Sequence, residues 1–407
     1  MLIVQKYGGT SVADSGKIFS AAEKIADDYL KNHDMVIVLS AQGNTTDLLL
    51  EKAGEISKDP SKRELDALLA TGEQQSAALM AMALKEKGLP AISLNARQAG
   101  IYSTSEHGCA KIVSINPDRI KEELKKRNIV VITGFQGITE QGEITTLGRG
   151  ASDTTAIALA AALLADLCEI YTDVEGIFTA DPRRVSDALK YKEIGYDETL
   201  ELSGMGASVL HSRSVALAKK FGVEFFVKSS AGGAAPTKIK EVQSIEKKVV
   251  SGITADRNMC KISLTNVWAS QVPVILRQLA VNGVSVDLLT HGAGDMSESL
   301  SFSVPDNMRG RLLEILGEHS DVSSEISIHE NLAKLSVIGT GIAYDTDIAA
   351  IFYETLLKDG VKVLLLSLSS MKISALVAED EVSGAIISLH ARFKEAGMLG
   401  PQVLGDK

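Results

Sequence analysis

Long apolar runs, cysteines and aromatic residues are features that this chain of 407 residues has little of. No apolar run reaches the roughly 18 residues that a transmembrane helix needs, so we expect no membrane span. The three cysteines, Cys109, Cys168 and Cys260, are far apart and odd in number. Their spacing fits neither a metal cluster nor a disulfide framework, so we expect buried free thiols.

The sequence also lacks a basic leader segment and an excess of positive charge. The N-terminus enters an apolar run at once, without the basic region and cleavage site of a signal peptide, so we expect a cytoplasmic protein. The net charge of −10 argues against a general nucleic-acid-binding protein. An anionic ligand would therefore depend on local positive groups, and lysine or arginine beside glycine becomes informative.

Several motifs with a known mechanism are absent. The phosphate loop G-x-x-x-x-G-K-[ST] does not occur, and G-x-G-x-x-G does not follow the first apolar run. Neither G-x-S-x-G nor H-E-x-x-H is present. His107 and His211 could belong to a polar site, although core or surface histidines are the commoner interpretation. No Ser/His/Asp or Cys/His arrangement is evident.

The first 230 or so residues alternate short apolar runs with helical patterns. This alternation predicts a largely parallel sheet with helices on both faces, in which ligands bind at the carboxyl ends of the strands. The predicted strands, rich in Val and Ile, span 2–7, 35–40, 91–95, 129–135, 168–173 and 223–230. The predicted helices span 17–31, 62–87, 117–127, 153–165 and 206–220.

The Gly-rich stretch 231–239 breaks this pattern and predicts a domain boundary or an extended connection. After about residue 260 a second pattern repeats with a period of about 75 residues. Each repeat predicts a strand, a helix, two strands, a helix and a possible last strand, which is a ferredoxin-like unit. We expect the two units to sense a ligand or mediate assembly; a purely structural or dimerising role is the alternative.

Two cationic side chains lie in glycine turns after predicted strands. Lys6 precedes two glycines in KYGGTS, and glycines let backbone N–H groups approach an anion closely. Arg149 lies in TLGRGASD, before an almost wholly apolar helix that Ser152 or Asp153 would cap. An arginine in such a turn has no obvious packing role. Both stretches predict anion-binding loops.

Hydroxyl and acidic side chains follow the other predicted strands. Ser40, Thr45 and Thr46 in SAQGNTTD could hydrogen-bond a polar substrate, although a helix N-cap at Asn44 or Thr45 explains the stretch equally well. Glu73 lies at the head of a long apolar helix, where the helix dipole favours a carboxylate in any case. YTDVEGIFTADPRRV could bind a ribose or a metal, or form an ordinary connection.

These groups suit a nucleoside triphosphate that meets a small anionic substrate. A carboxylate acceptor with a pKa near 4 is ionised at pH 7 and needs no general base. Catalysis would then consist of positioning and of charge neutralisation by lysine, arginine, helix ends and Mg²⁺.

The chain resembles the aspartate kinases of the amino acid kinase family over essentially its whole length. The resemblance rests on KYGGTS, SAQGNTTD, LLATGE, GFQG, TLGRGASDTTAIALAAAL and IYTDVEGIFTADPR in this order, and on a tail similar to paired ACT units. It implies an α/β amino acid kinase fold, a three-layer αβα arrangement with a largely parallel sheet, followed by two ferredoxin-like βαββαβ ACT units. The implied domains are a catalytic domain over 1–240 and ACT units over 241–332 and 333–407.

The resemblance implies ATP- and Mg²⁺-dependent phosphorylation of the β-carboxylate of L-aspartate to 4-phospho-L-aspartate. This reaction begins the biosynthesis of lysine, threonine and methionine. Glu73 would face the substrate ammonium, Arg149 a carboxylate, and no side chain is assigned to a metal. The implied catalytic residues are Lys6 and Asp153, and the substrate positions are Ser40, Thr46, Glu73, Arg149, Gly150 and Ser152. The implied nucleotide positions are Lys6, Tyr7, Gly8, Gly9, Thr172, Asp173, Phe178, Asp181 and Arg183.

Some positions depart from the family pattern. Ala151 replaces the second glycine of GRGGSD, Phe178 a common tyrosine, and Ser208 and Ser212 the Lys and Pro of GAKVLHP. LSLSSMKIS and TNVWASQVP depart in the ACT part, where Asp287 remains the candidate effector residue. We expect an amino-acid effector and a homo-oligomer formed through the ACT units, without nucleic acid or membrane. The alternatives are an inert amino-acid-sensing homologue and a kinase of a related carboxylate such as glutamate.

Overall fold

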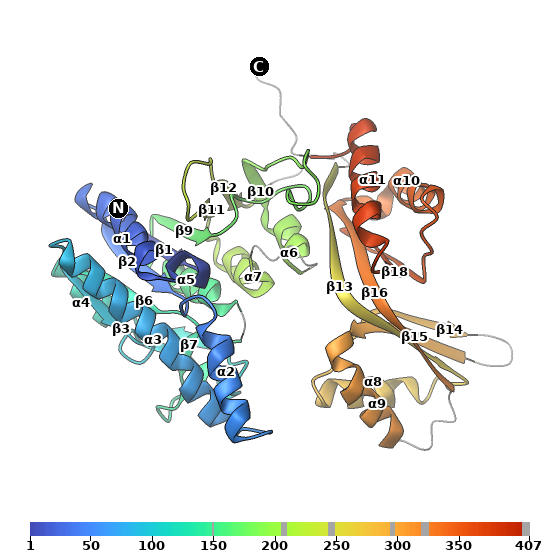
Figure 1. Cartoon of the computed structure of the whole chain (residues 1–407), viewed down its shortest axis with the longest axis horizontal. Helices are drawn as coiled ribbons and strands as arrows, with labels where there is room; N and C mark the ends of the chain where they lie inside the picture. Colours follow the sequence, from blue (N-terminus) through green and yellow to red (C-terminus); the bar gives the residue numbers. More distant parts are fainter. Residues whose placement is uncertain (149, 205–209, 243–248, 294–297, 319–324, 401–407) are drawn as a thin grey trace. The chain divides into compact units, whose positions relative to one another are not determined.

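The computed structural model describes two compact units, which we call the first and second units (Figure 1). The described residues are 1–148, 150–204, 210–242, 249–293, 298–318 and 325–400. The first unit comprises Met1–Ile177, Lys190–Ser203 and Ser208–Gln243, and the second comprises Phe178–Leu189, Gly204–Ala207 and Ser244–Lys407. Within the described residues no helix has the length and apolar character that crossing a bilayer requires. All three cysteines are free thiols, but Cys109 is exposed and only the other two are buried.

An eight-stranded sheet forms the centre of the first unit. All its pairings are parallel except that of β11 with β12, which confirms the predicted largely parallel sheet. Each of the six strands predicted in this part matches an observed strand to within two residues. The strand order is β10 (Glu193–Gly195), β12 (Thr237–Lys240), β11 (Phe225–Ser229), β9 (Leu167–Thr172), β1 (Leu2–Tyr7), β2 (Asp34–Leu39), β6 (Ile129–Thr133) and β3 (Ala91–Leu94).

Helices cover both faces of this sheet and give three layers. α1 (Ser15–Leu30) and α3 (Lys62–Glu86) pack on one face, and α5 (Ala151–Leu163) packs on the other against β1 and β9. Because side chains alternate along a strand, Lys6 faces α5 whereas Tyr7 faces α1 and α3. The remaining helices of this unit are η1 (Gly9–Val12), α2 (Thr45–Ile56), α4 (Asp118–Lys125), α6 (Tyr196–Gly204) and α7 (Ser212–Phe221).

A small second sheet in the first unit was not predicted. Its strands have three or four residues, too few for an alternating pattern to stand out. The predicted domain boundary at 231–239 overlaps β12. This strand pairs with β10 and β11, so the end of that stretch is part of the large sheet. The strand order of the small sheet is β5 (Ile112–Ile115), β4 (Ile101–Ser103), β7 (Gln136–Ile138) and β8 (Ile144–Thr146).

The second unit contains one six-stranded antiparallel sheet rather than two separate ones. Figure 1 shows α8 and α9 beside one end of its two long strands, and α10 and α11 beside the other. The strand order is β14 (Asp287–Ala293), β15 (Glu298–Pro305), β13 (Val249–Thr265), β16 (Glu325–Thr340), β18 (Lys372–Ala378) and β17 (Leu365–Leu368). The helices are α8 (Val272–Val281), η2 (Asp306–Met308), α9 (Arg309–Glu318), η3 (Ile342–Tyr344), α10 (Thr346–Lys358) and α11 (Val382–Glu395).

The long strands β13 and β16 contribute to both hydrophobic cores of the second unit. Ile262 of β13 packs in the core beneath α8 and α9, whereas Ile253 of the same strand packs with Phe352 of α10. The N-terminal part of β13 therefore packs in the hydrophobic core that the second repeat forms. The predicted limits of the two ACT units follow chain order and stay a prediction.

The segment Phe178–Leu189 groups with the second unit although the chain on both sides of it belongs to the first. Ala180 is buried in the core beneath α10 and α11. The backbone N–H of Ile253 donates to the carbonyl of Thr179 at 2.8 Å, and Nε2 of buried His390 lies 3.0 Å from Thr179 Oγ1. The second unit therefore holds this segment through apolar packing and hydrogen bonds.

Candidate active site

The carboxyl ends of the parallel strands β1, β2 and β6 are linked at one edge of the large sheet. The N–H of Ser40, after β2, donates to the carbonyl of Tyr7 at 3.2 Å. The N–H of Gly134, after β6, donates to the carbonyl of Leu39 at 2.9 Å. Gly8 directly follows β1 at the same edge. The loops that carry the predicted site residues therefore begin side by side.

Lys6 and Asp153, the predicted catalytic pair, are in contact. The Lys6 ammonium lies 2.6 Å from Oδ1 of Asp153, and the two side chains are 11% and 8% exposed. The contact is therefore a close, nearly buried ion pair. Asp153 lies in the first turn of α5, where the helix dipole also favours a carboxylate.

The two glycines of KYGGTS have backbone contacts of their own. The N–H of Gly8 donates to the carbonyl of Tyr171 in β9 at 3.2 Å. A Cβ on Gly9 would lie 2.6 Å from the carbonyl oxygen of Ala41, so a side chain there would displace the loop after β2. Close packing of the loops therefore accounts for glycine at position 9, independently of any phosphate.

The turn before α5 is built from glycines in the left-handed region. Gly148 has φ +85° and Gly150 has φ +69°, both unfavourable for other residues. A Cβ on Gly150 would also lie 2.7 Å from Cδ2 of His211, which brings this histidine to the turn. Arg149, the predicted carboxylate-binding residue between the two glycines, lies outside the described residues.

Ser152 and Asp153 lie inside the first turn of α5, so the prediction that one of them caps the helix was wrong. The N-cap is Gly150, whose left-handed backbone turns the chain into the helix without a side-chain hydrogen bond. Ser152 packs on the end of β6, because a Cβ on Gly134 would lie 2.5 Å from its Oγ. The start of α5 therefore abuts the strand ends.

Glu73 is buried, with 3% exposure, and it lies in the middle of α3. Its predicted place at the helix head was wrong, since α3 begins at Lys62, about three turns earlier. Oε1 accepts the N–H of Ala41 at 3.1 Å, whereas Oε2 has no hydrogen-bond partner among the described residues. Burial raises the pKa of Glu73 to about 7, and the hydrogen bond from Ala41 offsets this only in part.

Other buried polar atoms near these loops also lack a hydrogen-bond partner among the described residues. Such atoms are uncommon in folded proteins, and a bound polar ligand is one explanation for a group of them. They are Ser11 Oγ, Thr154 Oγ1 and His211 Nδ1.

Thr46, a predicted substrate position, is half-buried in the first turn of α2. The helix begins at Thr45 with Asn44 as its N-cap residue. The alternative interpretation of SAQGNTTD as a helix start is therefore correct for its second half.

The predicted nucleotide positions of the first unit differ in their surroundings. The ring of Tyr7 is buried and stacks on Tyr171 with 4.6 Å between centroids, and its hydroxyl donates to Gln5. Tyr7 is thus a core residue on the face opposite Lys6. Thr172 ends β9, and its hydroxyl donates to Asp173 Oδ1 at 3.0 Å.

Phe178, Asp181 and Arg183 lie in the segment that the second unit holds. The Arg183 side chain donates to both carboxylate oxygens of Asp181, at 3.0 Å and 3.2 Å. Partial burial raises the pKa of Asp181, but the hydrogen bonds and charge of Arg183 outweigh it and hold this pKa below its usual value. Of the predicted nucleotide residues, these three thus belong to a different unit from Lys6.

Asp287, the predicted effector residue, is paired with a buried lysine. Lys334 Nζ lies 2.5 Å from Asp287 Oδ2 and 2.9 Å from Asp256 Oδ2. Burial raises the pKa of Asp287, but the hydrogen bond and charge of Lys334 outweigh it and hold this pKa below its usual value. An internal ammonium therefore already neutralises this carboxylate.

Two charged residues beside the turn before α5, Asp66 and Arg213, were missed. Asp66 lies seven residues before Glu73 on α3, so an acidic residue recurring on the buried face of a helix was a usable signal. Arg213 offers no such signal, because one arginine in a helical pattern is ordinary. No group of three or more His, Cys, Asp or Glu side chains suited to a metal ion occurs among the described residues.

Comparison with known proteins gives concordant matches. Residues 1–229 match the model of the amino acid kinase family, and residues 335–393 match an ACT domain. An aspartokinase of Geobacillus stearothermophilus is 44% identical over 398 residues, which cover 96% of this chain and 97% of the relative. The crystal structure of E. coli aspartokinase III in complex with aspartate and ADP, in the R-state, has a TM-score of 0.80 at 25% identity and covers 97% and 100% of the chains. The same enzyme with lysine and aspartate, in the T-state, has a TM-score of 0.75 at 25% identity and covers 96% and 99%.

Proposed function

The chain belongs to the aspartokinases of the amino acid kinase family, and we propose that it transfers the γ-phosphoryl group of ATP to the β-carboxylate of L-aspartate. A carboxylate oxygen of aspartate bonds to the γ-phosphorus, and the bond from that phosphorus to the bridging oxygen breaks. ADP leaves with the electron pair, and 4-phospho-L-aspartate forms. Because the aspartate side chain is already ionised at pH 7, no general base is required.

The Lys6–Asp153 ion pair is the observation that carries this proposal. It places a buried ammonium at the end of β1, 2.6 Å from a carboxylate oxygen of Asp153. An ammonium has three N–H donors, so Lys6 can contact a phosphate oxygen while it stays paired with Asp153. Lys6 then neutralises charge that develops on the transferred phosphoryl group, and Asp153 fixes the direction of the lysine side chain.

Glu73 provides the second part of the proposed site. Its unpaired Oε2 suits an ammonium donor, and the α-ammonium of aspartate is such a group. Ser40, Thr46, Gly150 and Ser152 would line the same site, and Arg149 would bind a substrate carboxylate. These assignments follow from the family resemblance and from the common sheet edge.

The enzyme uses a nucleotide, and we propose Mg·ATP as its form. Mg²⁺ commonly binds phosphate oxygens, water and one or two carboxylates, so it needs no cage of protein ligands. Asp153 is the carboxylate that we propose for this role, since it lies in the first turn of α5 next to Lys6. When bound, Mg²⁺ would neutralise charge on the β- and γ-phosphates.

Replacing Lys6 by alanine tests the proposed reaction. We expect kcat for ADP formation with aspartate to fall by about 100-fold or more, since a single charge-stabilising donor is commonly worth that much. Lys17→Ala, at an exposed lysine of α1, is the control and should retain kcat. Normal turnover of Lys6→Ala would refute the role of Lys6. Wild-type turnover with glutamate or N-acetylglutamate instead of aspartate would indicate a related carboxylate kinase, and no turnover at all an inert sensing homologue.

We also propose a homo-oligomer formed through the second unit. β14 and β17 are the edge strands of its sheet, and β17 exposes Leu366 and Leu368. An amino-acid effector at this unit is the remaining proposal, and its ammonium would compete with Lys334 for Asp287. Light scattering after gel filtration tests assembly, and thermal shifts with lysine, threonine and methionine test binding.

A further inference from the structure

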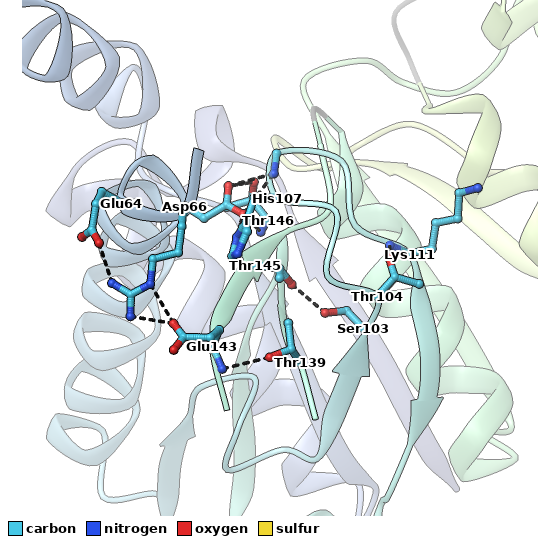
Figure 2. Close-up of polar contacts among 12 residues, drawn as sticks. Glu64, Asp66, Ser103, Thr104, His107, Lys111, Thr139, Glu143, Thr145 and Thr146 are labelled. Atoms are coloured by element: carbon cyan, nitrogen blue, oxygen red, sulfur yellow. Dashed lines mark hydrogen bonds and ion pairs between the residues drawn. The ribbon is translucent and has the colours of Figure 1, made fainter. Parts of the chain in front are cut away.

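Asp66 is the centre of a hydrogen-bonded cluster beside the turn that precedes α5. Figure 2 shows its side chain pointing from α3 toward His107 and Thr146. Asp66 is 1% exposed and accepts the N–H of Gly108 and the N–H of Thr146, each at 3.0 Å. It also accepts the hydroxyl of Thr146 at 2.5 Å, and Nδ1 of His107 lies 2.9 Å away. Four donors thus stabilise a buried carboxylate without a lysine or arginine partner in the described part of the chain.

Arg213, at the start of α7, binds the same two chain segments through their carbonyl groups. Nη1 donates to the carbonyl of Leu147 at 2.8 Å, and Nη2 donates to the carbonyl of Ala110 at 2.9 Å. Burial lowers the pKa of Arg213, and no described carboxylate forms an ion pair with it. Among the described residues, this half-buried guanidinium therefore binds backbone carbonyl groups.

The two segments also pair with each other, since the N–H of Ala110 donates to the carbonyl of Thr146 at 3.0 Å. Asp66 accepts hydrogen bonds from N–H groups of these two segments, and Arg213 donates to their carbonyl groups. We call these two side chains the loop clamp. The chain leaves the clamp at Leu147 and enters the turn of residues 148–150 directly.

We propose that Asp66 and Arg213 are positioning residues for the aspartate-binding turn, an inference that rests on the proposed function. Glycine has more backbone freedom than other residues, so holding Gly148 and Gly150 in one conformation costs more entropy than it would for other residues. The clamp fixes the entry of the turn, while α5 and the ring of His211 fix its exit. The substrate therefore meets Gly148 and Gly150 already held in place from both sides.

The position of Asp66 on α3 supports this role. Glu73, the proposed partner of the substrate ammonium, lies on the same helix, about two turns further along. One helix thus sets the place of the ammonium site and, through Asp66, of the turn that would bind a carboxylate. Residues seven apart lie on the same helix face, so both side chains point to the same side.

Arg213→Met tests the clamp, because it removes both donors and keeps an apolar stem. We expect KM for aspartate to rise about 10-fold or more, with KM for ATP changed less than about 2-fold. Arg213→Lys should be intermediate, since one ammonium cannot hold both carbonyl groups as the fork does. Thr146→Val removes a single donor to Asp66 and should raise KM for aspartate by a few-fold in a protein that folds. Glu64→Gln on the same helix turn, outside the clamp, is the control and should change neither KM.

A merely structural role would lower stability without separating the two KM values. Combining Asp66→Asn with Arg213→Met should raise KM for aspartate by less than the product of the single effects, because both hold one loop. Equal changes in both KM values, or an unchanged KM for aspartate, would overturn the proposal.

Amide hydrogen exchange of the peptide containing residues 145–152 tests the clamp without any substrate. We expect faster exchange in Arg213→Met than in wild type, and unchanged exchange would overturn the clamp whatever the activity. If exchange rises but wild type does not phosphorylate aspartate, then the proposed function fails while the clamp stands. Faster exchange with an unchanged KM for aspartate would show that the turn does not bind aspartate.

Discussion

Glu73→Gln should change both stability and aspartate binding in a pH-dependent way. Burial raises the pKa of Glu73 from 4.5 to about 7. The folded protein therefore binds this proton more tightly than the unfolded chain does. The resulting stabilisation is fully present below pH 4.5 and is lost as pH rises through 7. Glutamine keeps the shape of the side chain and cannot ionise. The variant therefore does not lose this stabilisation as pH rises.

The magnitude follows from the pKa of Glu73. One pKa unit corresponds to about 1.4 kcal/mol, so ionising Glu73 costs about 3 kcal/mol more in the folded protein than in the unfolded chain. About 2 kcal/mol of this falls between pH 5.5 and pH 8. Over this range the free energy of unfolding of Glu73→Gln should therefore gain about 2 kcal/mol relative to wild type.

Urea denaturation followed by far-UV circular dichroism at the two pH values measures this difference. Both units contain helices and strands, so far-UV circular dichroism reports the unfolding of each. The same pH dependence in wild type and Glu73→Gln would refute the reasoning about burial.

Aspartate binding provides the functional half of the test. If the substrate ammonium pairs with ionised Glu73, binding at pH 7 should release about half a proton, because a group at its pKa is half protonated. Calorimetric titration in two buffers of different ionisation enthalpy measures this release. Glu73→Gln should bind aspartate at least about 10-fold more weakly and release no proton. Proton release that persists in the variant would mean that another group is responsible.

Two further predictions concern the second unit. Burial lowers the pKa of His390 below 6.5, so folding excludes its proton and the stability of this unit should fall as pH drops below about 6.5. His390→Gln should flatten that dependence in urea titrations followed by far-UV circular dichroism, and an unchanged slope would assign it to other groups. Lys334→Met leaves Asp287 and Asp256 without their shared ammonium, and should destabilise the unit by about 1–3 kcal/mol, a value reduced by the partial exposure of both carboxylates. An unchanged urea midpoint would show that this cluster contributes no stability.

The features that could be predicted from the sequence are those that leave a periodic or local signal. The strand of MVIVLS is continuously apolar, and the large sheet buries both its faces, so its bounds were predicted to within one residue. KYGGTS and TLGRGASD could be recognised because glycines next to a cation are a local feature. The three-residue strands of the small sheet carry too few residues for any period.

Features that depend on distant contacts could not be predicted. The burial of Glu73 follows from the packing of α3 against the loop at Ala41, and the raised pKa follows from that burial. The pairing of Asp287 with Lys334 joins two strands far apart in the chain. The attachment of Phe178–Leu189 to the second unit includes a contact with His390, which lies more than two hundred residues further along the chain. Each of these facts requires the fold.

The attachment of Phe178–Leu189 bears on how the second unit could influence catalysis. Phe178, Asp181 and Arg183 match nucleotide positions by resemblance, and the core of the second unit fixes their backbone through Ala180 and Thr179. The chain then returns to the first unit at Lys190. We expect a ligand that repacks this core to shift the segment that carries these three residues, because a packed core transmits displacement. By reciprocity, nucleotide binding to these residues would alter the affinity of the second unit for its own ligand. The coupling should thus appear in KM for ATP before it appears in KM for aspartate, whose proposed partner Glu73 belongs wholly to the first unit.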